Sequence, residues 1–186
     1  NIMSKKEIKT LGDIKGLKFR AFGSVGSLLS ALGASVTFIP YGELYTAVAT
    51  GVIDAFTAGG PGDNLEGGFY EVAKYVVMPP VVGMGAQDVF INLDAWNALP
   101  DDLKAIFTVA VRDSAFSDAR FYHYRHAVGI GTMVTEHGVT VNTLPASDIA
   151  EMTNIAKGLW SELGEKDAHS AKVVEMVTEY FKELGL

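Results

Sequence analysis

Residues 17–57 read LKFRAFGSVGSLLSALGASVTFIPYGELYTAVATGVIDAFT, and this stretch decides the fold. Apolar, strand-like runs at residues 17–22, 35–39 and 52–57 are separated by helical patterns at residues 26–33 and 43–50. Pro40 closes the second strand, and Gly51 ends the second helix, as glycine commonly does. Strands that alternate with helices over such short connections predict a βαβαβ unit with mostly parallel pairing.

Weaker signals extend this α/β pattern toward the carboxyl terminus. After the loop at residues 59–62, Asp63 or Asn64 is a plausible N-cap for a helix through Lys74. We expect strands at residues 75–78, 88–92 and 139–141. Two amphipathic helices are predicted at residues 146–163 and 168–184.

The segment Leu99-Pro100-Asp101-Asp102 predicts the start of one unusually long helix. Proline suits the first helical position, and the two carboxylates face the positive end of the helix dipole. No further proline intervenes before about Thr135, although Gly129 and Gly131 weaken the pattern. A helix of about 35 residues spans ~50 Å, so it must bridge two lobes or lie along a long interface.

Composition excludes several classes of protein. The 186 residues carry 15 Lys and Arg against 22 Asp and Glu, a formal charge of −7, which argues against non-specific nucleic-acid binding. A hydrophobic share of 48% excludes intrinsic disorder, and the absence of cysteine excludes disulfides and cysteine-based zinc sites.

The longest uncharged run covers residues 21–42, but glycines and serines interrupt it and Pro40 ends it, so we expect no transmembrane helix. The chain opens on Asn1 without an initiator Met or the apolar core of a signal peptide. We therefore expect a fragment of a longer chain.

Arg20 is the most informative single residue, because it interrupts an otherwise apolar strand just before a Gly/Ser loop. Alternation places Arg20 and Phe22 on one face of the sheet and Phe19 and Ala21 on the other. Ligands of open α/β sheets bind at the carboxyl ends of the strands, where a guanidinium can grip a carboxylate with two hydrogen bonds. The alternative is a structural arginine that pairs with an internal acid or lies at the sheet edge.

Catalytic and nucleotide-binding motifs are not found. The glycine pairs of residues 60–62, 83–85 and 129–131 lack the third glycine of G-x-G-x-x-G, and no G-x-S-x-G elbow is present. His123 and His126 are spaced for a shared metal, but Arg120 and Arg125 would repel a cation, which favours a solvated helix face.

The remaining candidates have ordinary structural explanations. Asp54 could cap or bond to backbone at a strand end, Glu43 could compensate a helix dipole, and His137 could cap a helix end. The aromatic residues of the long helix are more typical of a core than of a ligand cage. They are Phe116, Phe121, Tyr122 and Tyr124.

Four ordered motifs then indicate a family. Residues 8–20, IKTLGDIKGLKFR, resemble the "I-K-t-l-x-D-l-K-G-l-K-x-R" stretch of DctP-type substrate-binding proteins of tripartite ATP-independent periplasmic (TRAP) transporters. Residues 43–55, ELYTAVATGVIDA, resemble their "E-x-Y-x-A-L-x-x-G-x-I-D-a" segment. Residues 68–75, GFYEVAKY, are close to the "G-F-Y-x-V-A-K-Y" of the branch that binds 2-oxo acids, and residues 92–100, NLDAWNALP, are similar to the lead into the family's long helix.

This resemblance implies an α/β, two-lobed periplasmic-binding-protein-like fold that closes around an organic anion, with a lobe-spanning helix near residues 100–136. It implies a βα ligand-binding lobe at about residues 14–92, the connecting helix at about 99–136 and a carboxyl-terminal strand and helices at about 139–186. Most of the family's amino-terminal lobe precedes this stretch, so the chain is expected to be a carboxyl-terminal portion.

The family's arginine in "K-x-R" holds the ligand carboxylate, and this role transfers by resemblance to Arg20. The oxo-acid branch also places Glu and Trp, which help to hold a cation, where Thr57 and Ala58 stand. Its second metal carboxylate falls near residues 81–85, which contain no acid. A cation site without carboxylates binds weakly or not at all, so we expect no metal or other cofactor.

The resemblance predicts a periplasmic, non-catalytic receptor that delivers an organic acid to TRAP membrane subunits. The expected pocket is wide and less polar, and Asp88 is a further polar candidate beside it. The expected ligand-binding residues are Arg20, Phe22, Thr57, Ala58, Gly59 and Gln87. Two alternatives stay open: an α/β enzyme acting on a small carboxylate, and a domain that self-associates through the surface left by a missing lobe.

Overall fold

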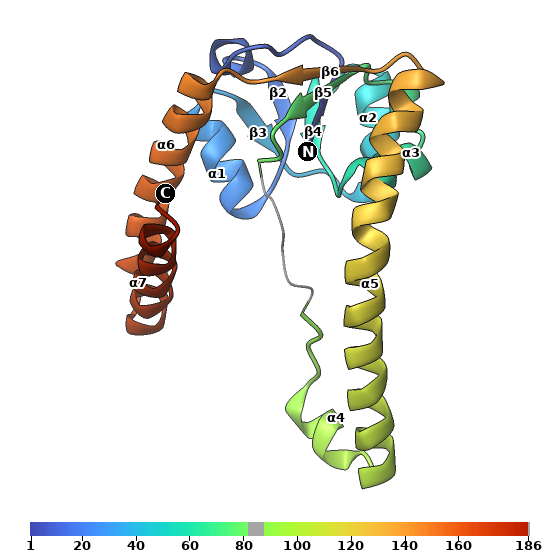
Figure 1. Ribbon diagram of the computed structural model, residues 1–186, viewed down its shortest axis with the longest axis vertical. Helices are drawn as coiled ribbons and strands as arrows, with labels where there is room; N and C mark the ends of the chain where they lie inside the picture. The colour runs from blue at the N-terminus through green and yellow to red at the C-terminus, as the bar shows by residue number, and fades with distance from the viewer. Residues whose placement is uncertain (82–87, 186) are drawn as a thin grey trace.

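The computed structural model describes residues 1–81 and 88–185, without the side chains of residues 118–120. Its centre is a six-stranded sheet with the strand order β3-β2-β4-β1-β5-β6 (Figure 1). β1 runs antiparallel to both of its neighbours, while the other pairs are parallel. The strands are β1 Ile2–Ser4, β2 Lys18–Arg20, β3 Ser35–Thr37, β4 Ala55–Thr57, β5 Tyr75–Met78 and β6 Thr140–Thr143.

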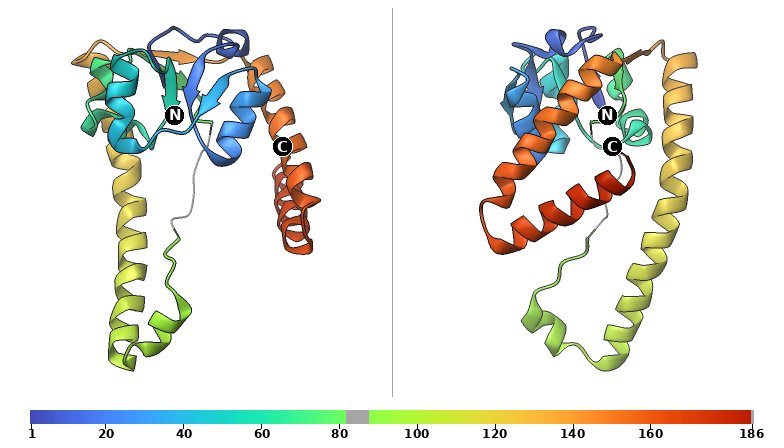
Figure 2. Two further views of the ribbon diagram at one scale, coloured as in Figure 1. Left: turned by 180° about the vertical axis from the view of Figure 1, so that it is seen from behind. Right: turned by 60° about the vertical axis from the view of Figure 1, so that its left-hand side comes forward.

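Helices cover both faces of this sheet (Figure 2). α1 and α6 contact each other, while α3 packs against α5, and α6 and α7 form a helical hairpin. The helices are α1 Gly23–Ala31, α2 Leu44–Ala49, α3 Pro61–Glu66, α4 Leu93–Ala98, α5 Asp101–Thr135, α6 Ala146–Gly164 and α7 Ala168–Glu183, with 3-10 turns at Leu11–Ile14, Tyr41–Glu43 and Phe69–Glu71.

The predicted β-α-β-α-β rhythm of residues 17–57 is confirmed, with each strand shorter than its apolar run. Alternation along the strands builds two cores, one on each face of the sheet. Ile2, Ala55 and Val77 face the core under α1 and α6. Their neighbours Met3, Phe56 and Val76 face the core that includes residues of α2 and α5.

Two expectations about local structure are wrong, and one strand was not predicted. Residues 88–92 form no strand, because β6 occupies the place beside β5 and Asn92 instead caps α4 by accepting a hydrogen bond from the Ala95 N–H at 3.1 Å. The antiparallel strand β1 was not predicted from the sequence, because no helical or turn signal precedes it. The helix expected from residue 63 to 74 begins at Pro61 and stops at Glu66, because Gly67 and the left-handed Gly68 follow.

The long helix is confirmed as α5, which runs 35 residues from Asp101 and leaves the sheet body for much of its length (Figure 1). Near its carboxyl end it crosses α3 at very close range. A Cβ built on Gly129 would lie 2.7 Å from the Gly62 nitrogen, and one on Gly62 would lie 3.0 Å from the Arg125 carbonyl oxygen. Gly129 therefore does not weaken α5 here but lets the two backbones touch.

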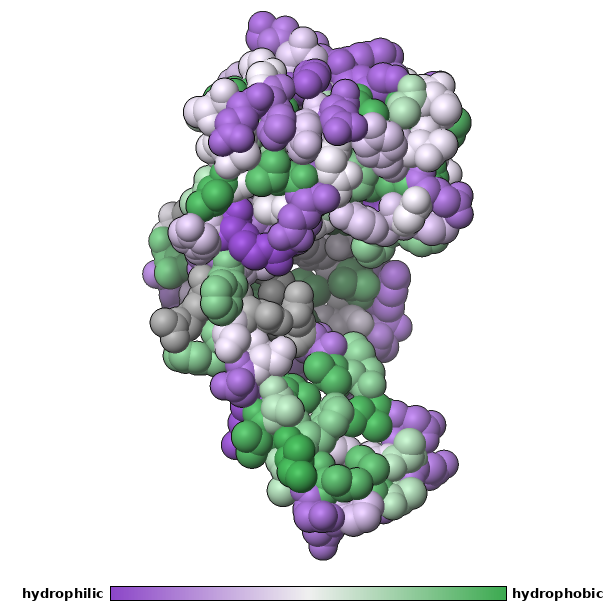
Figure 3. Space-filling view, turned by 90° about the vertical axis from the view of Figure 1, so that its right-hand side faces the viewer, coloured by the Kyte–Doolittle hydropathy of each residue, from purple (hydrophilic) through white to green (hydrophobic). Residues whose placement is uncertain are grey.

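The aromatic residues of α5 do not form a core, which corrects the expectation for them. Phe116, Phe121 and Tyr124 are each at least 65% exposed, and Tyr122 is 37% exposed, because no other described helix or strand covers the middle of α5. Apolar side chains also gather where α4 meets the start of α5 (Figure 3). In the described part of the chain, no helix is both long and apolar enough to cross a membrane.

Candidate functional site

Arg20 ends β2, and its side chain is 5% exposed. Its Nε donates to the Ile39 carbonyl oxygen at 2.9 Å, and its Nη1 donates to the Thr57 carbonyl oxygen at 2.6 Å. The Ile39 carbonyl follows β3, and the Thr57 carbonyl ends β4. Because β3 and β4 are the two strands beside β2, the guanidinium spans the carboxyl ends of three parallel strands. Among the side chains that the structure describes, no Asp or Glu pairs with Arg20, so the internal ion pair considered above is not found there.

Two aromatic rings flank the guanidinium. Its carbon lies 5.1 Å from the centre of the Phe22 ring and 5.7 Å from that of Phe38, within range of cation–π attraction. The rings themselves meet edge to face at 6.1 Å. Burial lowers the pKa of Arg20 from its ordinary value, yet an arginine stays protonated at physiological pH. The site therefore presents a fixed cation that has lost much of its water.

A cavity of about 490 Å³ opens beside Arg20. Five of the six predicted ligand-binding residues line it together: Arg20, Phe22, Thr57, Ala58 and Gly59. The sixth, Gln87, lies outside the described residues, and Asp88 is exposed. The other lining residues are Asn1, Gly23, Ser24, Val25, Tyr41, Val81 and Tyr122.

The aromatic walls of this cavity were missed from the sequence. Tyr41 begins the 3-10 turn after β3, so the rule that sites lie beyond the carboxyl ends of parallel strands could have found it. Tyr122 comes from the distant helix α5, and only the α3–α5 contact brings it here. Burial and the nearby charge of Asp63 raise the pKa of both phenols, so both rings are neutral.

The cavity does not fit a metal cation. The Thr57 backbone oxygen accepts from Arg20, Ala58 offers a methyl group, and no acidic residue is among the described lining residues. The nearby Asp63 is already engaged, accepting from the Gly60 N–H at 2.8 Å and from Arg125 at 3.2 Å. Across the described residues, no group of three or more His, Cys, Asp and Glu could hold an ion.

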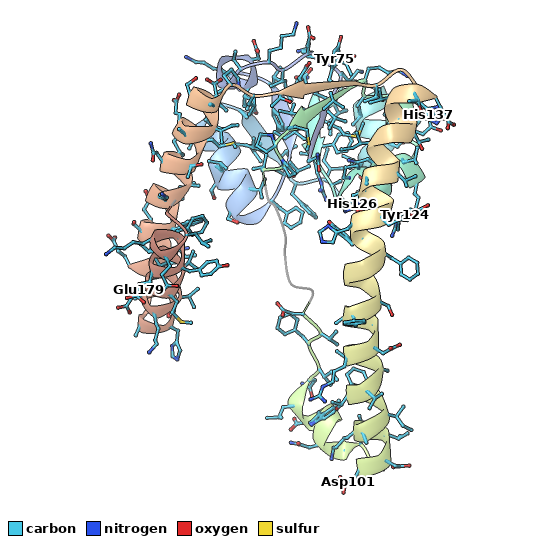
Figure 4. All side chains as sticks on the ribbon, viewed as in Figure 1. Tyr75, Asp101, Tyr124, His126, His137 and Glu179 are labelled. Carbon is cyan, nitrogen blue, oxygen red and sulfur yellow. The ribbon has the colours of Figure 1, made fainter. Side chains whose placement is uncertain are left out.

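His126 borders a second, smaller cavity and is not on a solvated helix face as expected. Its Nδ1 accepts a hydrogen bond from the Gly62 N–H at 3.1 Å, and its buried Nε2 has no hydrogen-bond partner among the residues that the structure describes. Figure 4 shows His126 and Tyr124 on different sides of α5. Burial lowers the pKa of His126 by more than the charge of Asp63 raises it, so the ring is neutral. The neutral ring thereby links α5 to α3 through its hydrogen bond with Gly62.

Other candidates have structural roles. Asp54 accepts from the Lys18 N–H at 3.0 Å and pairs with Lys6 at 2.9 Å, as expected of an acid that bonds to backbone near a strand end. Glu43 ends a 3-10 turn directly before α2. His137 stacks on Tyr70 with ring centres 3.7 Å apart, and it therefore packs rather than caps.

Comparison with known proteins identifies the family of this chain. The model of bacterial extracellular solute-binding proteins, family 7 (DctP), matches residues 1–167. A monocarboxylate 2-oxoacid-binding periplasmic protein of Nostoc sp. is 31% identical over 97% of this chain. This chain covers 50% of that relative, so it spans about half of its length.

Two solved structures are similar in fold. A TRAP periplasmic solute-binding protein of Pseudoalteromonas atlantica with bound sodium and pyruvate is 31% identical, with a TM-score of 0.82 over 99% of this chain and 56% of that one. One from Chromohalobacter salexigens with bound (S)-(+)-2-amino-1-propanol is 22% identical and shows the fold alone, with a TM-score of 0.87 over 98% of this chain and 56% of that one.

Proposed function

This chain belongs to the bacterial extracellular solute-binding proteins of family 7, and on that premise we propose that it forms part of a periplasmic receptor for an organic acid anion. The receptor delivers its ligand to the membrane subunits of a TRAP transporter. In this proposal the chain has three parts: the βα lobe at about residues 14–92, the connecting helix at about 99–136 and the carboxyl-terminal elements at about 139–186. The cavity beside Arg20 is one side of the ligand cleft.

The observation that carries this proposal is a buried arginine without an acid. A cation that has left water is costly unless an anion or several acceptors compensate it. Nε and Nη1 of Arg20 each donate a hydrogen bond to a backbone carbonyl, whereas Nη2 has no hydrogen-bond partner among the described residues. A ligand carboxylate at the cavity would supply the missing negative charge through a charge-assisted hydrogen bond.

The other predicted residues shape the rest of the cleft in this proposal. Phe22 forms one apolar wall, while Thr57, Ala58 and Gly59 form the edge of β4 and the turn after it. Gln87 lies outside the described residues, and its role in ligand binding stays a prediction. The ligands named for two relatives, a 2-oxo acid and pyruvate, are carboxylates of the expected class.

The first test is Arg20→Ala in the complete product of the gene, titrated by calorimetry with organic acids. We expect binding to weaken by roughly 1–3 kcal/mol or more, because a hydrogen bond to a charged group is lost. Arg112→Ala is the matched control, since Arg112 is exposed and does not line the cavity. Unchanged affinity in Arg20→Ala would remove Arg20 from the site.

An enzyme acting on a small carboxylate is the competing function. The family to which the chain belongs consists of solute-binding proteins, which counts against it. No acid–base pair lines the Arg20 cavity within the described part of the chain. Incubating the protein with each bound acid and following it by NMR tests this alternative, and any turnover above the Arg20→Ala background would favour the enzyme.

A further inference from the structure

We propose that the ligand is a monocarboxylate with a flat apolar body, of the aryl-acetate class, and that it binds without a metal ion. This inference rests on the proposed function and narrows it to one class of acid. It departs from the small 2-oxo acids and the cation named for the relatives.

The first step is the charge of the cavity. Arg20 is the only charged side chain among its described lining residues, so this side of the cleft favours an anionic ligand. Among the described lining residues, a bound cation or a ligand ammonium group would have no carboxylate to meet, and it would face the guanidinium. Metal chelates and amino acids are therefore disfavoured against simple carboxylates.

The second step is the surface that the ligand body would touch. Phe22 and Tyr41 are 61% and 52% exposed, and both line the cavity. Val25, Ala58 and Val81 add apolar side chains, and Tyr122 adds a third ring. Such walls stabilise a ligand by burial of apolar area and by ring-to-ring contact, neither of which a small polar oxo acid can supply.

The third step is that two of these rings are already held in place. Phe22 packs edge to face against Phe38, and Tyr41 packs edge to face against Phe69 at 5.7 Å. Rings fixed by such neighbours lose little conformational freedom when a ligand binds, which favours affinity. The volume of about 490 Å³ lies within the range of about 300–1,000 Å³ that is typical of sites for larger organic ligands.

The position of the apolar walls relative to Arg20 completes the argument. The Phe22 ring lies 5.1 Å from the guanidinium carbon, so the apolar wall begins directly beside the group that would hold the carboxylate. Arylacetates carry an aromatic ring one carbon away from a carboxylate. Phenylacetate is therefore the natural probe, and phenylacetamide, phenylalanine and pyruvate are its matched comparisons.

The experiment is calorimetry on the complete gene product with these four compounds, in excess EDTA and again with calcium or sodium. We expect phenylacetate to bind with the same affinity in all conditions. The other three compounds should each bind at least tenfold more weakly. Phenylacetamide lacks the charge, phenylalanine adds an ammonium group, and pyruvate lacks the ring. Chelator-sensitive binding of phenylacetate would overturn the metal-free claim.

Phe22→Leu tests the ring contact directly. We expect phenylacetate affinity to fall about three- to tenfold, because the aromatic contact is lost while the wall stays apolar. Phe121→Leu is the control, since Phe121 is 65% exposed on α5 and does not line the cavity. Unfolding temperatures of both variants show whether either change acts through folding.

The two proposals fail in different ways. Tight, cation-dependent pyruvate binding with weak phenylacetate binding would overturn this inference and leave an organic acid receptor standing. Absence of binding for every carboxylate, with or without cations, would overturn both. Equal affinity for phenylacetate in wild type and Phe22→Leu would remove the aromatic wall from the account.

Discussion

Arg20 shows how far a single residue could be interpreted from the sequence alone. Its place at the end of an apolar strand predicted a site at the carboxyl edge of the sheet, and the structure puts it at that edge with a cavity beside it. The sequence could not give its partners, because the carbonyls of Ile39 and Thr57 reach it only through the register of β3 and β4.

Asp54 supports a prediction at the same scale. Burial opposes its ionisation, but hydrogen bonds from the Lys18 N–H and from Lys6 outweigh burial and lower its pKa below the ordinary 3.8. Asp54→Ala should therefore reduce the free energy of unfolding by about 1–2 kcal/mol at neutral pH. Urea titrations measure this loss.

The same substitution carries a pH signature. Because the folded-state pKa is depressed, the contribution of Asp54 is complete well above about 3.8 and is lost as the pH falls through the folded-state pKa. The difference between wild type and Asp54→Ala should shrink in that window. Asp113→Ala, at an exposed position of α5, is the control, and an equal loss there would contradict a specific role for Asp54.

At the scale of elements, local signals placed most helices and strands correctly, and tertiary contacts decided the rest. The proline-led start of α5 and the amphipathic patterns of α6 and α7 were sufficient for the helices from residue 101 onward. They were not sufficient for residues 88–92, whose apolar run Val89-Phe90-Ile91 indicated a strand that the structure does not form, or for β1, whose three residues are held between two neighbouring strands.

The contact between α3 and α5 predicts opposite effects for two glycines of one helix. Gly129→Ala forces a methyl group into the backbone of Pro61 and Gly62, so it should destabilise the fold by about 1–3 kcal/mol. Gly131→Ala meets nothing within 4 Å and should stabilise α5 by up to about 1 kcal/mol. Thermal unfolding measures both, and equal shifts of the same sign would contradict the close crossing.

The same contact predicts a dependence on pH through His126. Its depressed folded-state pKa means that its contribution is complete above the ordinary value of 6.5 and is lost as the pH falls through the folded-state pKa. Protonation would also remove the acceptor of the Gly62 N–H. His126→Gln should flatten the dependence of the unfolding free energy on pH below pH 6.5, whereas His123→Gln should not. Identical profiles for the two variants would contradict a role of His126 in the contact between α3 and α5.

At the scale of the whole molecule, the chain matches about half of its relatives' length. α5 and α7 extend from the sheet body (Figure 1), and both carry exposed apolar side chains. Figure 3 shows those near the start of α5. The length of α5 predicted a bridge or a long interface, whereas which apolar residues it leaves exposed could be learned only from the arrangement of layers.

Self-association of the isolated chain is the prediction at this scale. Phe90, Leu93, Ile106 and Val109 are each at least 62% exposed where α4 meets the first turns of α5. Exposed apolar groups that gather in this way favour association. Sedimentation velocity should show a mass that rises with concentration, and Ile106→Lys with Val109→Lys should shift it toward the monomer; a concentration-independent monomer would contradict this.

The central claim is that Arg20 holds a ligand carboxylate, and a double-difference titration tests it most directly. Phenylacetate and phenylacetamide are each titrated into wild type and into Arg20→Gln of the complete gene product. The account predicts that the substitution weakens phenylacetate binding about tenfold or more and leaves the weak amide binding nearly unchanged. An equal loss for both compounds, or no loss for the acid, would contradict it.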